Sequence, residues 1–198
     1  MRLPHLRPSE LDADQRALYD ALTTGQRRRV HDALPTAVQM TDEEGRLQGP
    51  FNAMLVHPKL GYALQEVSRQ LRFEGRLPAR TREIVILVVA ASEQSDFEWA
   101  AHAAIAASAG VPADAIDAIG AESKTEFDDP LDDAAALLAR SLVNHGDVDD
   151  ETYMRAQRVL GDDGVFEVST TVGIYQLIAQ QLRVFRVPAP PGPWFTRA

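Results

Sequence analysis

The chain has 198 residues, of which 45% are hydrophobic and 25% are charged, a balance typical of a soluble globular protein and not of a disordered one. Its formal net charge of -9 disfavours nucleic acid as a partner, because binding to phosphates requires a basic surface. The chain contains no cysteine, which excludes disulfides, thiolate metal sites and every thiol mechanism.

No segment has the pattern of a targeting or membrane-spanning sequence. The N-terminal residues MRLPHLRPSELDADQ include no apolar stretch of the signal-peptide type. The longest strongly apolar run is IVILVVAAS at 84–92, which is about half the length that a bilayer span requires. We therefore expect a soluble, cytoplasmic protein without a membrane partner.

The N-terminal quarter predicts one helix and then a long connection. Residues 9–25 offer Ser9 or Asp12 as the N-cap and end in a glycine. Residues 26–52 contain several Gly and Pro and show little helical periodicity. A connection of this length is usually functional or packed on a partner. We assign residues 1–48 to this N-terminal segment and leave open whether the connection closes a pocket.

Two helices are predicted next, over residues 57–75 and 77–94. The first carries an apolar stripe at helical spacing, formed by Leu60, Leu64, Val67 and Leu71. The second begins with a proline and is apolar on every face. Its length and its proline favour a fully buried central helix over a strand.

The remaining sequence predicts helices that open with an N-cap residue or a proline and mostly close with a glycine. They cover residues 95–110, 111–120, 128–146, 147–161 and 164–187. No segment sustains the alternation of a strand, so the predicted fold class is all-α, with about eight helices. Glu83 and Glu167 each lie early in an apolar helix, which hints at two related halves.

The last ten residues differ from the preceding helical segments in composition. We assign residues 49–188 to the helical domain and residues 189–198 to a Pro-rich, extended tail. Trp194 and Phe195 are expected to anchor this tail to the body of the protein or to a neighbouring subunit. The aromatic tail and the nearly uncharged helices together predict a homo-oligomer.

Three ionisable side chains are candidates for chemistry. Glu98 and His102 are four residues apart, so on a helix they share one face. Glu83 enters an otherwise apolar helix and needs a partner such as Arg80, Arg82 or His102, because burying an unpaired carboxylate is costly. A partly buried carboxylate beside an imidazole is a typical general acid–base pair near neutral pH.

Each of these residues also has a structural interpretation. Ser95 and Glu98 fit a capping box, in which the glutamate reaches back to the helix start. His102 fits a buried core histidine, and Glu83 fits an ion pair with a nearby arginine. A metal site built from Glu83, Glu98 and His102 is conceivable, but no second histidine recurs at ligand spacing, so we predict no metal.

Two stretches, LPARTREIVILVVAA and EQSDFEWAAHAAIAASAGV, resemble the core of the carboxymuconolactone decarboxylase and alkylhydroperoxidase D-like family. The segments GPFNAMLVHPKLG and GDDGVFEVSTTVGIY resemble flanking parts of longer members. The resemblance implies an all-helical fold that assembles as trimers or hexamers. The peroxidase branch carries a Cys-x-x-Cys-x-x-x-His motif preceded by a glutamate. Here His102 and Glu83 take the histidine and glutamate positions, whereas the cysteine positions fall on Ser95 and Glu98, so thiol peroxidase activity is not expected.

The decarboxylase branch implies a different chemistry, because it acts without a cofactor on a carboxylated lactone. On this resemblance His102 is the proton donor, and Glu98 or Glu83 is its partner. Arg72 or Arg82 would hold the substrate carboxylate, although both arginines also fit surface ion pairs at helix ends.

The same resemblance implies two further cavity residues. Asn52 and His57 would line the cavity, although His57, which precedes a proline, also fits an ordinary loop residue.

Two functional hypotheses follow. The first is a cofactor-independent acid–base enzyme for a small carboxylated or enolisable substrate, with decarboxylation as the default and isomerisation, cyclisation or hydrolysis left open. The second is a non-catalytic accessory or scaffold member that has lost its chemistry together with its cysteines.

Overall fold

The computed structural model describes residues 1–24, 28, 33, 36, 38–192 and 195. These residues form a short 3-10 helix, η1, and the helices α1 and α3 to α9. The bounds are Pro8–Glu10 for η1, Ala13–Thr23 for α1, Gly49–Met54 for α3, Pro58–Phe73 for α4, Ala79–Ser92 for α5, Asp96–Ser108 for α6, Ala113–Gly120 for α7, Pro130–His145 for α8 and Asp150–Phe185 for α9. Within these described residues the β-structure is one isolated bridge between Thr41 and Leu47. The all-α prediction is confirmed.

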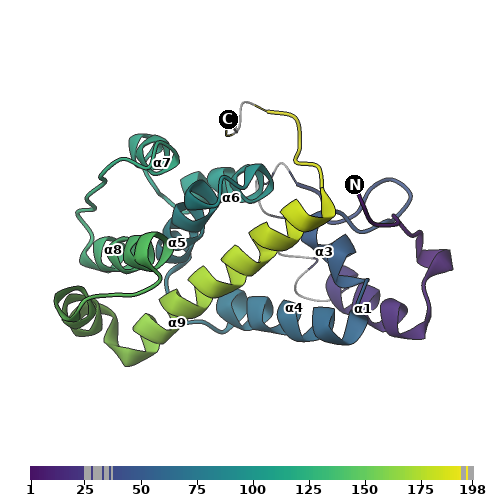
Figure 1. Ribbon diagram of the computed structural model, residues 1–198, viewed down its shortest axis with the longest axis horizontal. Coiled ribbons are helices and arrows are strands. Elements are labelled where there is room, and N and C mark those ends of the chain that lie inside the picture. Colours follow the sequence, from purple (N-terminus) through teal and green to yellow (C-terminus); the bar gives the residue numbers. More distant parts are fainter. Residues whose placement is uncertain (25–27, 29–32, 34–35, 37, 193–194, 196–198) are drawn as a thin grey trace.

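Helix α9 contacts helices on both sides of the molecule. It runs diagonally across the view in Figure 1 and contacts α5 and α8 on one side and α3 and α4 on the other. Helix α5 additionally contacts α6 and α7, and α1 packs against α4. Elements far apart in the sequence therefore meet along α9.

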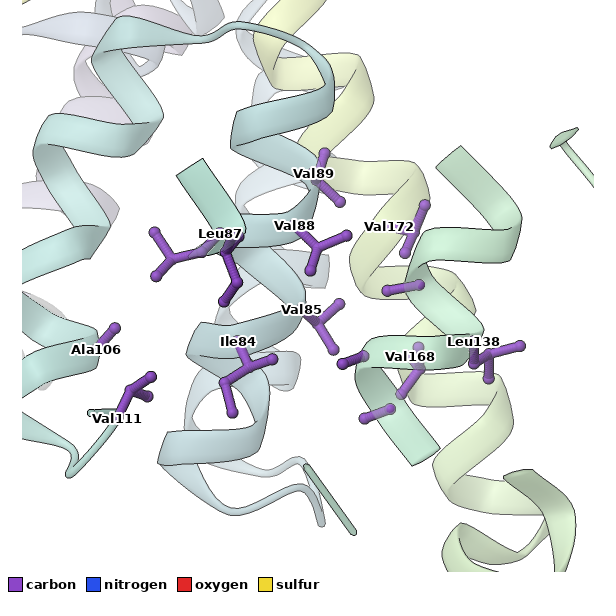
Figure 2. Packing of buried hydrophobic residues seen from close by; sticks show 14 of the residues in the cluster. Ile84, Val85, Leu87, Val88, Val89, Ala106, Val111, Leu138, Val168 and Val172 are labelled. Carbon is purple, nitrogen blue, oxygen red and sulfur yellow. The ribbon is translucent and has the colours of Figure 1, made fainter. Parts of the chain in front are cut away.

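The main core surrounds α5, as the sequence predicts. Ile84, Val85 and Leu87 on this helix have no exposed surface. Figure 2 shows side chains of α5 facing Ala106 and Val111 on one side and Leu138 and Val168 on the other. Because neighbouring elements cover α5 on several sides, its sequence has no polar face.

Helix ends lie close to where the sequence predicts them, with two differences. One concerns the residue that caps α1, and the other is an interruption within α9. Asp12, not Ser9, caps α1, and its carboxylate accepts a hydrogen bond from the Gln15 amide at 2.8 Å. Helix α8 ends at Gly146, which has a φ of 68°. Gly161, with a φ of 71°, interrupts α9, so the two helices predicted around this glycine are two helical segments joined at a kink.

The predicted stripe of α4 faces the core only in part. Leu60 and Val67 are 53% and 37% exposed, whereas Gly61, Gln65 and Leu71 are buried. A Cβ atom on Gly61 would lie 2.5 Å from the Met54 carbonyl oxygen. The absence of a side chain at Gly61 therefore lets α4 approach α3 closely, and Gly61 rather than its neighbour Leu60 lies on the buried face.

Both ends of the chain pack on the helices. Leu18, Met40 and Leu47 share a buried apolar cluster that joins the first helix to the connection after it. The ring of Phe195 lies edge-on to Trp99 with centroids 5.2 Å apart, and its amide donates to Asp96 at 2.9 Å. Phe195 thus anchors the tail as predicted, whereas Trp194 and most of residues 25–37 lie outside the described residues.

A helix that crosses a bilayer needs about 20 mostly apolar residues. Among the residues that the structure describes, no helix is both long enough and apolar enough to do so.

Candidate active site

Glu83 and His102 form a buried hydrogen-bonded pair between α5 and α6. His102 Nδ1 lies 2.6 Å from Glu83 Oε2, and Glu83 has no exposed surface. Since an ionised carboxylate only accepts hydrogen bonds, Nδ1 carries the proton and donates it to Glu83. The second ring nitrogen, Nε2, then faces Glu98 Oε2 at 3.7 Å. Glu83 therefore fixes both the ring orientation and the tautomer of His102.

Glu98 does not cap its own helix. Ser95 is the N-cap of α6, but its side chain makes no capping hydrogen bond. Glu98 is only 4% exposed and lines a cavity together with His102. The capping-box interpretation of these two residues is thus wrong in this structure.

Arg72 and Tyr175 complete the polar end of the site. Arg72 on α4 lies 3.5 Å from Glu83 Oε1 and also interacts with the hydroxyl of Tyr175 on α9. The Tyr175 ring meets the His102 ring edge-on, with centroids 5.3 Å apart. Arg80, a candidate partner of Glu83, pairs with buried Asp132 at 2.7 Å instead.

The cavity has a volume of about 110 Å³ and joins a polar end to an apolar wall. Its polar lining includes Gln65, Arg72, Glu98, His102 and Tyr175. Its apolar wall comes from α3, α4, α6, α9 and the connection between α1 and α3, through residues that include Val38, Met40, Phe51, Met54, Phe73, Phe97 and Ile178. The connection therefore lines the cavity, and the space suits a small molecule, since an apolar cavity of about 150 Å³ accommodates benzene.

The two glutamates differ in their affinity for a proton. Burial raises the pKa of Glu98. Burial also acts to raise the pKa of Glu83, but the hydrogen bond from His102 and the charges of Arg72 and Arg82 outweigh it and lower that pKa. Glu83 is thus the ionised carboxylate, and Glu98 keeps its proton to higher pH. Burial raises the pKa of Tyr175 to about 12, so its hydroxyl stays a neutral donor.

Asn52 and His57 do not line the cavity, contrary to the expectation drawn from the family resemblance. The Asn52 amide is buried but donates to the Pro4 carbonyl oxygen at 3.3 Å. His57 is exposed and caps α4, where its Nδ1 accepts a hydrogen bond from the Leu60 amide at 3.3 Å. A histidine directly before the proline that opens a helix is placed to serve as this cap.

Of the two predicted arginines, the structure brings only Arg72 to the cavity. Arg82 lines a different hollow, described below. Sequence reasoning assigned no role to Gln65 or Tyr175. Two features of the sequence could have indicated these residues: Gln65 is a glutamine on the inner face of α4, and Tyr175 is the single tyrosine in the apolar half of α9.

A metal site needs several acidic or histidine side chains that converge on one point. Among the residues that the structure describes, no group of three or more such side chains has an arrangement that could hold a metal ion.

Comparison with known sequences finds a family match within the chain. Residues 58–140 match the profile of the carboxymuconolactone decarboxylase family, and this segment contains Arg72, Glu83, Glu98 and His102. No curated protein sequence matches the chain. The polar end of the cavity thus lies mostly inside the family segment, to which α9 adds Tyr175.

Solved structures share the fold. An uncharacterised peroxidase-related protein from Ralstonia eutropha JMP134, described as an alkylhydroperoxidase AhpD core, superposes with a TM-score of 0.71 at 16% identity, over 96% of this chain and 92% of that one. The debrominase Bmp8 gives a TM-score of 0.59 at 13% identity, both without ligand and as a cysteine-to-alanine variant with 2,3,4-tribromopyrrole. The match covers 70% of this chain and 76% of the ligand-bound debrominase. At these identities the likeness shows the AhpD-like fold alone.

Proposed function

We propose that this family member is a cofactor-independent acid–base enzyme for a small carboxylated or enolisable substrate, with decarboxylation as the default reaction. The observation that carries the proposal is the His102 ring, which Glu83 holds at 2.6 Å while its other nitrogen and Glu98 face the cavity. Two carboxyl groups whose pKa values move in opposite directions on either side of one imidazole are typical of acid–base sites.

The charges of the site suit a substrate that carries one negative charge. The guanidinium groups of Arg72 and Arg82 both lie within 3.8 Å of one carboxylate, that of Glu83. When Glu98 is protonated and His102 is neutral, this cluster has one positive charge in excess. A carboxylate entering the cavity beside Arg72 would offset that charge.

The proposed reaction begins with cleavage of the bond between the substrate carboxylate and its neighbouring carbon. Carbon dioxide leaves, and the electron pair of the broken bond remains on the substrate as an enolate. Arg72 and the Tyr175 hydroxyl stabilise the enolate oxygen because they are held in place before the charge develops. Glu98 and His102 Nε2, which lie 3.7 Å apart, together deliver one proton to the substrate carbon, and solvent then returns a proton to that pair.

The same groups would also serve an isomerase, a cyclase or a hydrolase, because each of these reactions moves protons at an activated carbon or oxygen. An accessory role without chemistry is the alternative. It differs in a measurable way, since replacing His102 would then change stability alone.

The decisive experiment compares two histidine variants. Purified protein is incubated with 4-carboxymuconolactone and related lactone acids, and turnover is followed for the wild type, His102→Ala and His57→Ala. We expect the first variant to lose at least about 100-fold in kcat/KM, because general acid–base catalysis contributes about that much or more. His57→Ala is the matched control, because this histidine is exposed and lies outside the cavity, and it should retain wild-type turnover.

Equal turnover by the wild type and His102→Ala would refute the assigned site. If the wild type converts no enolisable acid, the accessory role replaces the enzymatic one.

A further inference from the structure

We propose that a second hollow beside the active-site cavity is a binding site for a small oxyanion, a carboxylate or a phosphate. This hollow has a volume of about 280 Å³ and is open to solvent. Its lining consists of Arg72, Phe73, Ala79, Arg82, Ile105, Ser108 and Ala109, of which Arg72, Phe73 and Ile105 also line the active-site cavity. The proposal concerns binding only and does not depend on the proposed reaction.

The first observation is a buried guanidinium whose Nε has no acceptor. Arg82 is only 9% exposed, and its buried Nε has no hydrogen-bond partner among the described residues. Its nearest carboxylate oxygen, Glu83 Oε1, is 3.8 Å from Nε, which is beyond hydrogen-bond range. A guanidinium carries five N–H donors, and leaving such donors buried without partners is unfavourable. An oxyanion in the hollow would supply the missing acceptors.

The second observation is the start of α5, which lies at the same hollow. Ala79 is the first residue of this helix and lines the hollow. The N-cap, Pro78, provides no side-chain hydrogen bond, so the amides of the first helical turn have no capping acceptor. A helix of 14 residues presents a partial positive charge at this end, and free amides there are donors suited to anions.

The third observation is the balance of charge around the hollow. Arg72 and Arg82 are close enough to repel one another, and both rely on the single carboxylate of Glu83. The other nearby carboxylate, that of Glu167, is already engaged, because its oxygens accept hydrogen bonds from the Arg76 and Leu77 amides at 2.8 and 3.2 Å. Glu167 keeps its negative charge but is held at those amides, so an added anion would give Arg72 and Arg82 a second acceptor beside Glu83.

The C-terminal end of α6 opposes this attraction only weakly. Ser108 and Ala109 lie at that end and line the hollow. A helix C-terminus carries roughly half a negative charge, which is less than the full charges of two guanidiniums. The planar fork of a guanidinium matches two oxygens of a carboxylate or a phosphate, and this geometry defines the ligand class.

The test is a titration of the full-length protein with sodium phosphate and with sodium acetate, at ionic strength held constant with sodium chloride. Isothermal calorimetry should show saturable binding, and the melting temperature should rise by at least about 2 °C at saturation. Whichever of the two anions binds more tightly identifies the chemistry of the natural ligand. The variant Arg82→Gln should weaken that binding at least about ten-fold, because it removes both the charge and the fork.

Arg76→Gln is the matched control. The Arg76 side chain is 75% exposed, pairs with Asp163 and does not line the hollow, so this variant should bind like the wild type. Equal affinities of the wild type and Arg82→Gln, or equal losses in both variants, would overturn the proposal.

A second measurement covers the case in which Arg82→Gln does not fold. The Nε–Hε resonance of Arg82 in the wild-type protein should shift with phosphate or acetate along the calorimetric binding curve. If that resonance stays unchanged while surface arginines respond, the hollow is not an anion site.

Discussion

The Glu83 and Glu98 side chains flank the same imidazole, yet their environments differ in the number of positive partners. Glu83 accepts the His102 proton at 2.6 Å and lies near Arg72 and Arg82. Glu98 has the other imidazole nitrogen at 3.7 Å and is otherwise enclosed by the cavity wall. The positive and hydrogen-bonding partners of Glu83 favour its ionised form, whereas burial favours the neutral form of Glu98. The division into a fixed anion and a proton carrier therefore follows from local contacts.

The raised pKa of Glu98 predicts a specific dependence of stability on pH. The folded protein holds this proton above the usual pKa of a glutamic acid side chain, whereas the unfolded chain releases it near that usual pKa. The contribution of Glu98 to the free energy of unfolding therefore falls as pH rises from the unfolded pKa through the folded pKa, and then levels off. The variant Glu98→Gln has no titratable group at this position, so its free energy of unfolding does not show this decline. Chemical denaturation at pH values between about 4 and about 8 should show Glu98→Gln gaining stability relative to the wild type as pH rises.

Glu83→Gln is the control with the opposite sign. Because the pKa of Glu83 is lowered, its ionised form stabilises the fold above the unfolded pKa, and this stabilisation is lost as pH falls through the folded pKa. Glu83→Gln should therefore be most destabilising near neutral pH. A stability difference between Glu98→Gln and the wild type that stays constant with pH would contradict the assignment of Glu98.

At the scale of the helices, glycines serve two different purposes in α9. Gly161 has a φ of 71° and a ψ of 173°, a conformation that residues with a side chain rarely adopt, and it separates the two segments of the helix. Gly173 lies within the second segment, is exposed and has helical geometry. A Cβ atom would meet no neighbour within 4 Å at either position, so the backbone alone decides the effect of a substitution.

These two glycines form a matched pair for mutagenesis. Gly161→Ala should lower the free energy of unfolding by about 1–3 kcal/mol, because alanine must adopt a strained conformation or straighten the kink. Gly173→Ala should raise it by about 0.5–1 kcal/mol, because alanine restricts the unfolded chain and favours helix. Urea denaturation of both variants measures the difference. Equal effects would show that the kink at Gly161 is not needed.

At the scale of the whole molecule, several large apolar side chains remain uncovered. Phe166 on α9 is 73% exposed, and on α4 Leu60 and Tyr62 are 53% and 49% exposed. Exposed aromatic and aliphatic side chains of this size are typical of contact surfaces between proteins. We propose that the chain forms a homo-oligomer, a trimer or a hexamer, and that Phe166 is buried in its interface.

The oligomer is tested with two substitutions that add the same charge. Phe166→Asp should shift the mass measured by light scattering toward the monomer at micromolar concentration, because it places a carboxylate in an apolar contact. Ser123→Asp adds the charge at an exposed position outside α9 and should keep the wild-type mass. A wild-type protein that is already monomeric would refute the proposal.

Local sequence patterns determined the helices of this protein and the family-based interpretation of its acid–base residues. Capping residues and glycines mark helix ends through contacts within a few residues, so Asp12, Gly146 and Gly161 were readable from the sequence. The sequence also predicted that Glu83 needs a partner, because a carboxylate in so apolar a helix is costly to bury alone. It left Arg80, Arg82 and His102 open as partners, and the structure selects His102 for the hydrogen bond.

The composition of the cavity depended on tertiary packing. Tyr175 and Gln65 reach it from α9 and α4, whereas Asn52 bonds to the N-terminal segment and His57 caps a helix. The side of a helix that faces inward depends on how closely its neighbours approach, as Gly61 shows for α4. Such contacts join residues that are distant in the chain, and no local pattern encodes them. The sequence alone therefore singled out Glu83, Glu98 and His102 as candidates, and only the tertiary structure decided which side chains surround them.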